Sequence, residues 1–379
     1  MSKITVEVLR INKIEEHKNA EKLELCHIAG WQSVVPKGKF KVNDLVVYIP
    51  IGASLPDQLA EKIGVKKYLG RGNSVKAAKL RGEPSYGIVV NPLDIGLPKV
   101  HEGKDLTNKL GIVKYIPGEV QPPNPSISNK VRRWIKTNLF KLLRITGKRP
   151  QVVKRGKHLL VQHPLFHIYT DMDNLRKHPS KLDGLEVVVT EKIHGCNSRI
   201  GLIKEDGKWR EVYGSHYSFC PGTETRYYFP FTKPEVKTLL YSLLEVLNPK
   251  HSIVIYGEMF GGSIQGEMQY KVPKGSIQYG YKIFDIKVDD KYIDFTQLEE
   301  LVPTDLLVPI INRGAFTYSE LVKMAEGKTL INEAGHIREG IVVKPVKELH
   351  DPKLGRVIFK YPSDDYLCGN FESDTEPEL

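Results

Sequence analysis

The amino-acid sequence predicts an α+β protein in which a small all-β barrel precedes a larger domain of mixed strands and helices. Up to about residue 115, short apolar runs alternate with Gly, Pro, Asp and Asn turns, which is typical of a small barrel. From about residue 161, short β-branched segments are mixed with stretches of helical periodicity. A proline-rich break over residues 117–125 separates the two patterns and predicts a domain boundary.

The first domain, residues 1–115, is predicted to be an OB-like β-barrel. Its clearest strands cover residues 4–8, 23–25 and 45–49, where apolar residues recur with period two. The stretch 17–31 is similar to the start of tRNA-binding OB-folds. Such barrels commonly bind single-stranded nucleic acid, and they also serve as structural platforms.

Residues 116–160 are expected to form a Pro-rich, basic linker that contains a helix. Between residues 129 and 157 there are eleven Lys and Arg residues and no Asp or Glu, which matches the whole net charge of +11. Apolar residues at three- and four-residue steps over 131–142 predict an amphipathic helix. Such a segment suits an RNA backbone, an anionic membrane surface or a solvated linker without a ligand.

The composition favours a cytoplasmic protein, most simply a monomer. The sequence contains no run of roughly 18 apolar residues that could span a membrane, and its first residues lack the apolar core of a signal peptide. The four cysteines form no C-x-x-C pair, so they predict reduced thiols and no zinc site or disulfide. The acidic tail 372–379 is expected to be disordered.

The second domain, residues 161–371, is predicted to contain helices over 239–247, 295–302 and 318–325. Between and around these helices lie five strand-like segments, each of which carries a charged or aromatic residue. They cover residues 187–195, 256–262, 281–286, 338–344 and 356–360.

The first segment delivers Lys192 from a β-branched run onto a turn that contains Gly195. A strand end of this kind can present a nucleophilic amine. A free lysine, with a pKa of about 10.4, is protonated at neutral pH. A neighbouring cation, a metal ion or burial favours the neutral amine, and Lys344 and Lys360 are the expected cations.

Glu258 and Glu339 each stand beside a glycine in a strand-like stretch. Two carboxylates would repel a phosphate unless a cation lay between them. The sequence therefore predicts a Mg²⁺ or Mn²⁺ site at Glu258 and Glu339, with several ligands supplied by water.

The five segments, in this order, resemble the motifs of the covalent nucleotidyltransferases, the superfamily of RNA ligases, DNA ligases and mRNA capping enzymes. The resemblance implies an adenylyltransferase domain of antiparallel, ATP-grasp-like sheets with helices. It also implies that Lys192 attacks the α-phosphorus of ATP to form lysyl–AMP. AMP then passes to a 5′-phosphate, and a 3′-hydroxyl displaces it.

The resemblance also implies roles for individual residues. Phe284 and Val342 would hold the two faces of the purine, although such residues are more often core. The implied catalytic residues are Lys192, His194, Glu258, Glu339, Lys344 and Lys360. The implied nucleotide-binding residues are Glu191, Ile193, Gly195, Asn197, Arg199, His216, Phe284 and Val342.

Two positions depart from the family pattern. Relatives carry an Arg or Lys where this chain has the stretch 213–216, so His216, Arg199 or Arg226 is the candidate replacement. The fifth motif usually has two lysines, and here Lys360 is alone, so the second cation is Arg356, Lys344 or absent.

The form Lys-x-His-Gly-x-Asn, with His194 and Asn197, is found in one branch of RNA ligases, whereas DNA ligases and capping enzymes usually have Asp at the histidine position. Those two classes also place an OB domain after the fifth motif, and only 19 residues follow Lys360. The chain therefore looks like the Deinococcus-type ATP-dependent RNA ligases, with RNA as partner. The alternatives are a GTP-dependent capping enzyme, a DNA ligase, or a nucleic-acid-binding protein whose catalytic core has decayed.

Overall fold

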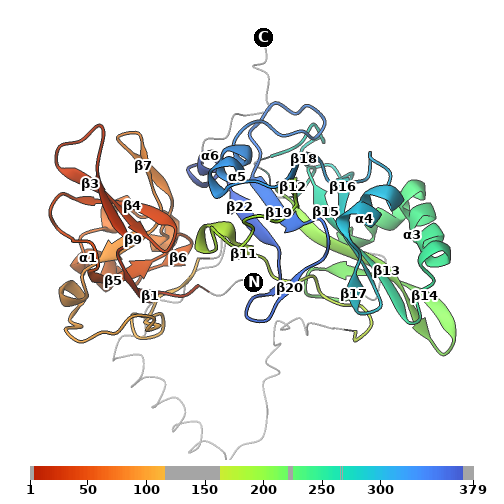
Figure 1. The fold of residues 1–379 in the computed structure, drawn as a ribbon, viewed down its shortest axis with the longest axis horizontal. Helices are drawn as coiled ribbons and strands as arrows, with labels where there is room; N and C mark the ends of the chain where they lie inside the picture. Colours follow the sequence, from red (N-terminus) through yellow and green to blue (C-terminus); the bar gives the residue numbers. More distant parts are fainter. Residues whose placement is uncertain (1–3, 116–162, 221–224, 265, 267, 370–379) are drawn as a thin grey trace, which may run out of the picture. The chain divides into compact units, whose positions relative to one another are not determined.

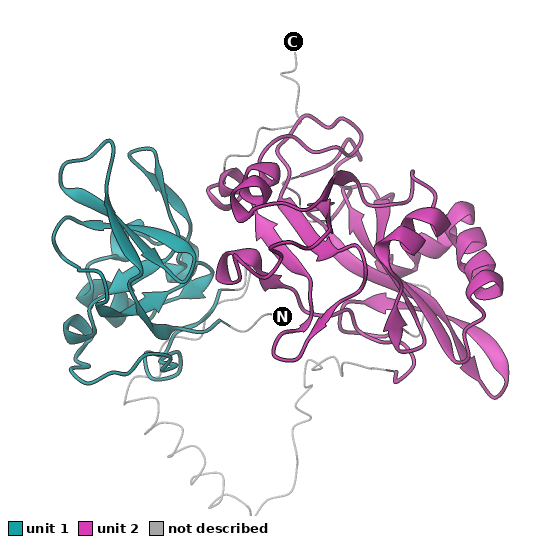
Figure 2. Cartoon of the chain, viewed as in Figure 1, with its two compact units in different colours: residues 1–159 teal, residues 160–379 magenta. Residues whose placement is uncertain are grey.

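The structure is a computed structural model that describes residues 4–115, 163–220, 225–264, 266 and 268–369. The chain divides into two compact units, Met1–Leu159 and Leu160–Leu379 (Figure 2). The predicted basic helix and most of the predicted linker lie outside the described residues, as does the acidic tail. No helix among the described residues is long and apolar enough to cross a membrane.

The first unit is built from short antiparallel strands, as the period-two pattern predicts. Its main sheets have the orders β1-β5-β9 and β2-β3-β4, and β6 pairs with β10 and β7 with β8. The strands are β1 (Glu7–Arg10), β2 (Lys13–Glu16), β3 (Leu23–Ile28), β4 (Trp31–Pro36), β5 (Leu45–Ile49), β6 (Ala53–Ser54), β7 (Ala78–Leu80), β8 (Glu83–Ser85), β9 (Ile88–Val90) and β10 (Val113–Lys114). The helices are α1 (Asp57–Lys62) and the short 3-10 helices η1 (Lys66–Tyr68), η2 (Arg71–Asn73) and η3 (Pro92–Ile95).

The second unit contains two five-stranded sheets. One has the order β11-β22-β19-β12-β18 and the other β14-β13-β15-β16-β17. The strands are β11 (Asp173–Asn174), β12 (Val187–Lys192), β13 (Cys196–Glu205), β14 (Lys208–Ser215), β15 (Ser252–Phe260), β16 (Gly280–Val288), β17 (Lys291–Tyr292), β18 (Ile310–Gly314), β19 (Gly340–Pro345), β20 (His350–Asp351), β21 (Gly355–Arg356) and β22 (Phe359–Pro362).

The helices of the second unit confirm the three predicted from the sequence. The helices are η4 (Leu175–Lys177), η5 (Arg226–Thr232), α3 (Pro234–Leu247), α4 (Phe295–Leu301), α5 (Tyr318–Ala325) and α6 (Asp364–Leu367). Helix α3 begins with a proline, which suits the first helical position, and ends at Asn248 in the left-handed conformation. Helix α5 begins with a capping box between Thr317 and Glu320.

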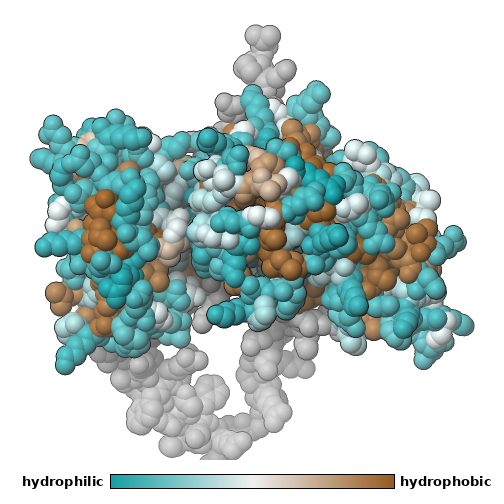
Figure 3. All heavy atoms as spheres, viewed as in Figure 1, coloured by the Kyte–Doolittle hydropathy of each residue, from teal (hydrophilic) through white to brown (hydrophobic). Residues whose placement is uncertain are grey.

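Four apolar clusters hold the described part of the second unit together, and three of them show how its layers pack. Helix α3 covers the sheet that contains β13 and β15 (Figure 1), and it buries Leu240 and Leu243 against strand residues such as Ile255. Helix α5 covers the sheet that contains β12 and β19. A third cluster, with Tyr169 and Tyr256 at its centre, joins residues of both sheets. On the face drawn in Figure 3, apolar side chains form separate small areas among polar ones.

One irregularity in the second sheet matters for the site. Between β15 and β16 the register shifts, because Tyr256 pairs with Asp285 while the next residue, Gly257, pairs with Ile283. Phe284 is therefore the extra residue of a β-bulge, a feature that redirects side chains next to functional sites.

Candidate active site

Lys192 is the last residue of β12, which lies between β19 and the edge strand β18 of its sheet. Its ammonium group donates to Oε1 of Glu339 at 2.7 Å, and the two side chains are 21% and 11% exposed. Burial by itself would lower the pKa of Lys192, but the carboxylates of Glu339 and Glu258 raise it above the ordinary value. The expectation that cations surround this amine is therefore only partly correct, since two carboxylates dominate its environment.

Glu258, on β15, approaches the turn that follows Lys192. A Cβ at Gly195 would lie 2.2 Å from the carbonyl oxygen of Met259 and 2.9 Å from Cγ of Glu258. Only glycine permits this close approach, which explains the Gly195 of the sequence motif. Burial, aided by the charge of Glu339, raises the pKa of Glu258 to about 8, although Lys192 opposes the shift.

His194 is buried beside the same carboxylates, as the motif predicts. Its Nδ1 lies 3.7 Å from Oε2 of Glu339 and 2.9 Å from the hydroxyl of Tyr366 on α6. Its backbone N–H donates to the hydroxyl of Tyr270 at 2.8 Å. Neither tyrosine was expected from the sequence, so the structure adds Tyr366 and Tyr270 as residues that position His194.

Two further predicted residues lie in this group. Lys360 lies on β22, where it pairs with Val342 of the neighbouring strand β19. Burial lowers the pKa of Lys360, and the nearby charge of Lys192 lowers it further. Asn197 pairs with Glu258 across β13 and β15, so both side chains lie on one face of the sheet. Its buried Oδ1 has no hydrogen-bond partner among the described residues, as expected of an acceptor that serves a ligand.

Phe284 and Val342 come from different sheets, and both are half-buried at the edge of the cluster that contains Tyr169. The rings of Tyr169 and Phe284 meet edge-on with centroids 4.9 Å apart. Neither side chain is enclosed by the core, so both are available to flank a flat apolar ring. This placement is compatible with the predicted purine site.

Lys344 is not beside Lys192. It pairs with Val188, four residues before Lys192, which is roughly 13 Å along the strand at about 3.3 Å per residue. Its ammonium donates to Asp285 at 2.9 Å, and Arg356 donates to the other oxygen of Asp285 at 2.7 Å. Both cations are almost fully buried, so the structure assigns neither of them to a phosphate at Lys192.

Two of the predicted nucleotide-binding residues, Glu191 and Ile193, turn their side chains away from Lys192. Glu191 lies on the opposite face of β12, where its carboxylate accepts hydrogen bonds from the Thr329 hydroxyl and from the backbone N–H of Leu330. Ile193 is buried in an apolar cluster with Phe260 and Tyr270. These two residues flank Lys192, and alternation along the chain turns their side chains away from the face that it occupies.

Arg199 is also a structural residue. Its guanidinium is 1% exposed and donates to the carbonyl oxygens of Ser215 and Phe166. Burial lowers the pKa of this group to about 10. His216, by contrast, is half-buried near Asp171 at 3.9 Å, and Asp171 is also one of the charges that Lys360 senses. Of the candidates for the missing cation, His216 therefore borders the site and Arg199 does not.

The residues present fit a divalent cation that keeps several waters. The described residues contain no group of three or more His, Cys, Asp or Glu side chains that could hold a metal. Glu339 nevertheless contacts Lys192, Glu258 lies within electrostatic reach of the same ammonium, and the unpartnered oxygen of Asn197 is on the residue that pairs with Glu258. Mg²⁺ is commonly held by one or two carboxylates together with water and substrate phosphates.

The comparisons with known proteins agree with this geometry. Residues 185–362 match the family model described as RNA ligase, and residues 5–93 match a model described as an OB-fold domain. Most of the second unit therefore matches RNA ligases, and most of the first unit matches an OB-fold domain. The predicted fold class and the resemblance to RNA ligases are confirmed.

Solved structures show that the likeness in fold extends over most of the chain. Naegleria gruberi RNA ligase with PPi aligns with a TM-score of 0.69 and 22% identity, over 97% of this chain and 98% of that one. A variant of the same ligase with ATP and Mn aligns with a TM-score of 0.68 and 22% identity, over 96% and 98%. Protein Early 65 kDa of Autographa californica nuclear polyhedrosis virus is 22% identical over 57% of this chain. The chain spans 40% of that viral protein's length.

Proposed function

We propose that this protein is an ATP-dependent RNA ligase that joins a 3′-hydroxyl to a 5′-phosphate through a covalent lysyl–AMP on Lys192. The observation that carries the proposal is the position of Lys192 at a strand end, where it is paired with Glu339 and within electrostatic reach of Glu258, on the sheet whose strand β19 supplies Val342. Solved forms of Naegleria gruberi RNA ligase contain ATP or AMP together with Mn, which supports ATP and a divalent cation here.

The reaction divides into three displacements at phosphorus. The neutral amine of Lys192 attacks the α-phosphorus of ATP, the bond to the β-phosphate oxygen breaks, and pyrophosphate leaves. An oxygen of the RNA 5′-phosphate then attacks the adenylyl phosphorus, and Lys192 leaves and regains its proton. Finally the 3′-hydroxyl attacks the 5′-phosphorus and loses its proton, and AMP leaves as the phosphodiester forms.

The site residues take roles that follow from their positions. Glu258 and Glu339 would hold the divalent cation, which would offset their charge, favour the neutral amine of Lys192 and stabilise the phosphates. Lys360 would balance negative charge on the phosphorus under attack. His194, oriented by Tyr366, holds Glu339 in place. Phe284 and Val342 would flank the adenine.

The decisive test is covalent labelling with nucleotide that carries a label on the α-phosphate. With Mg²⁺, label from ATP should survive denaturing electrophoresis of the wild type, and Lys192→Ala should show none because the attacking amine is gone. Lys208→Ala, which removes an exposed lysine of β14, is the matched control and should be labelled normally. Label that remains in Lys192→Ala would refute the mechanism. Label from GTP alone would indicate capping chemistry.

A further inference from the structure

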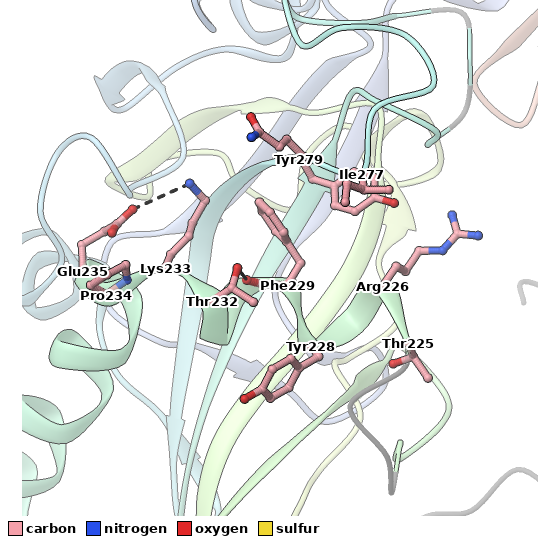
Figure 4. A pocket seen from close by; sticks show the side chains of 11 residues that line it. Thr225, Arg226, Tyr228, Phe229, Thr232, Lys233, Pro234, Glu235, Ile277 and Tyr279 are labelled. Carbon is pink, nitrogen blue, oxygen red and sulfur yellow. Dashed lines mark hydrogen bonds and ion pairs between the residues drawn. The ribbon is translucent and has the colours of Figure 1, made fainter.

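A groove lies beside the candidate active site, between η5 with the start of α3 and the segment 277–279 that precedes β16 (Figure 4). It has a volume of about 800 Å³. Its walls include aromatic rings and basic side chains, and of these residues the sequence indicated only Arg226, as a candidate for the missing cation. The ones that carry the argument are Arg226, Phe229, Lys233, Ile277 and Tyr279.

The rings in the groove are fixed in position but remain accessible. Phe229 and Tyr279 meet edge-on with centroids 5.1 Å apart, and the hydroxyl of Tyr279 lies 3.0 Å from Oγ of Ser263. Both rings are half-buried. Ile277, between them and the solvent, is 85% exposed. A pre-positioned aromatic pair of this kind offers a surface on which nucleic-acid bases can stack.

The charges of the groove suit a polyanion. Arg226 is exposed and forms no ion pair with another described residue, and in Figure 4 its side chain extends along the edge of the groove. Lys233 lies 5.4 Å from the centre of the Phe229 ring and is paired with Glu235 at 3.7 Å (Figure 4). The charged residues that line the groove are Arg226, Lys233 and Glu235, so its net charge is positive.

The groove is connected to the candidate active site through the strand pair that carries Glu258. Tyr281 pairs with Met259, the residue after Glu258, so Tyr279 lies just beyond the end of the strand pair that carries Glu258. Burial raises the pKa of the Cys196 thiol to about 12, and Glu258 adds to this shift while Arg226 opposes it. Arg226 and Glu258 therefore both lie within electrostatic reach of the same thiol.

We propose that this groove binds a single-stranded stretch of RNA next to the ends to be joined, with bases stacked on Phe229 and Tyr279 and phosphates on Arg226 and Lys233. This inference rests on the proposed function for the identity of the nucleic acid. Stacking is sequence-tolerant, because every base has a flat face, so the groove confers affinity without base preference. An acidic peptide would use the cations but would leave the aromatic pair without a matching partner.

The test measures binding of a fluorescent single-stranded RNA oligonucleotide to the full chain by anisotropy. Phe229→Ala and Tyr279→Ala should each weaken the Kd by about tenfold, the usual effect of losing one stacking ring. Tyr279→Phe keeps the ring and should bind as the wild type does. Tyr241→Ala, which removes an exposed tyrosine of α3 outside the groove, is the matched control and should also leave the Kd unchanged.

A second variant guards against loss of packing. Ile277→Glu introduces a carboxylate at an exposed position, where it cannot unfold the domain, and it should weaken RNA binding by repulsion from the backbone. Arg226→Ala should reduce the slope of log K against log salt by about 0.7, the value for one single-strand phosphate contact. If Phe229→Ala, Tyr279→Ala and Ile277→Glu all bind RNA as tightly as the wild type, the proposal is overturned.

Covalent labelling by ATP separates this inference from the proposed function. It needs no RNA, so the Tyr279→Ala variant should still be labelled while its RNA affinity falls. A wild type that ATP does not label would overturn the ligase proposal, whereas the binding series would still decide whether the groove takes RNA.

Discussion

Two clusters of charged side chains in the second unit are both buried, but their charges are matched differently. In the sealed cluster, the carboxylates of Asp285 and Glu348 are paired with Lys344 and Arg356. In the open cluster, defined by Lys192, Glu258, Glu339 and His194, one ammonium is shared by two carboxylates. Every carboxylate of the first cluster forms an ion pair. In the second, Lys192 pairs with Glu339, whereas Glu258 forms no ion pair with another described residue, although Lys360 adds a positive charge nearby.

The pKa values show the consequence of this difference. In the sealed cluster, burial would raise the pKa of Asp285, but Arg356 and Lys344 hold it below its ordinary value. In the open cluster, burial and Glu339 raise the pKa of Glu258 to about 8. Buried charge is stabilised where the protein supplies its partner, and a shifted group that lacks one indicates a functional site.

Breaking the sealed cluster should have the largest effect on stability. Asp285→Asn leaves Lys344 and Arg356 buried beside a neutral amide, and it should lower the free energy of unfolding by about 3–5 kcal/mol. Glu299→Gln, which breaks an exposed pair with Arg313, is the control and should change stability by about 0–1 kcal/mol. Denaturant unfolding of both variants measures this, and equal losses would show that the sealed cluster is not a stabilising unit.

Replacing Glu258, the carboxylate without an ion-pair partner among the described residues, should change how the stability of the protein depends on pH. The pKa of Glu258 rises from 4.5 to about 8 on folding, so the folded wild type holds a proton that the unfolded chain has lost. Wild-type stability should therefore fall, relative to Glu258→Gln, as pH rises from about 4.5 to about 8, by up to about 5 kcal/mol.

Unfolding curves of the wild type and Glu258→Gln at several pH values measure this difference. Mn²⁺ without nucleotide should reduce it above pH 8 in the wild type, since a cation stabilises the ionised carboxylate. A difference that does not vary with pH would mean that Glu258 is already matched, and the distinction between the clusters would fail.

A smaller effect is expected at the edge of the open cluster. Tyr366→Phe removes the hydroxyl that lies 2.9 Å from Nδ1 of His194. It should cost about 1 kcal/mol of stability and slow self-adenylylation by about three- to tenfold, because His194 no longer holds Glu339 in one orientation. Tyr241→Phe, whose hydroxyl donates to Glu211 on the surface, is the control for the rate. Loss of stability without a slower reaction would make Tyr366 purely structural.

Part of this molecule was predictable from its sequence. The helix over 318–325 was correct because a capping box and regular apolar spacing define it locally. Lys192, Glu258 and Glu339 were correctly expected to converge because five motifs in order carry more information than any one of them. The errors at Glu191 and Ile193 arose because β12 is buried almost throughout, so its composition does not reveal which face holds the site.

The remaining errors concern partners that are distant in sequence. Lys344 was assigned to a phosphate, but Asp285, 59 positions earlier, takes its ammonium. Tyr366 reaches His194 across 172 positions, and no local pattern indicates that pair. Strand periodicity gives the direction of a side chain but does not identify what it contacts.

The predicted purine site depends on the β-bulge, because the one extra residue in β16 is Phe284. Asp285 pairs with Tyr256, and Ile283 pairs with Gly257. Phe284, between them, therefore has no partner residue on β15. Its neighbour Asp285 belongs to the sealed cluster, whereas Phe284 belongs to the predicted purine site. Deleting this single residue would restore a regular ladder and leave every charged group in the chain. The sheet would then be better ordered while the purine site lost one wall, which means that a more ideal backbone would make a poorer enzyme.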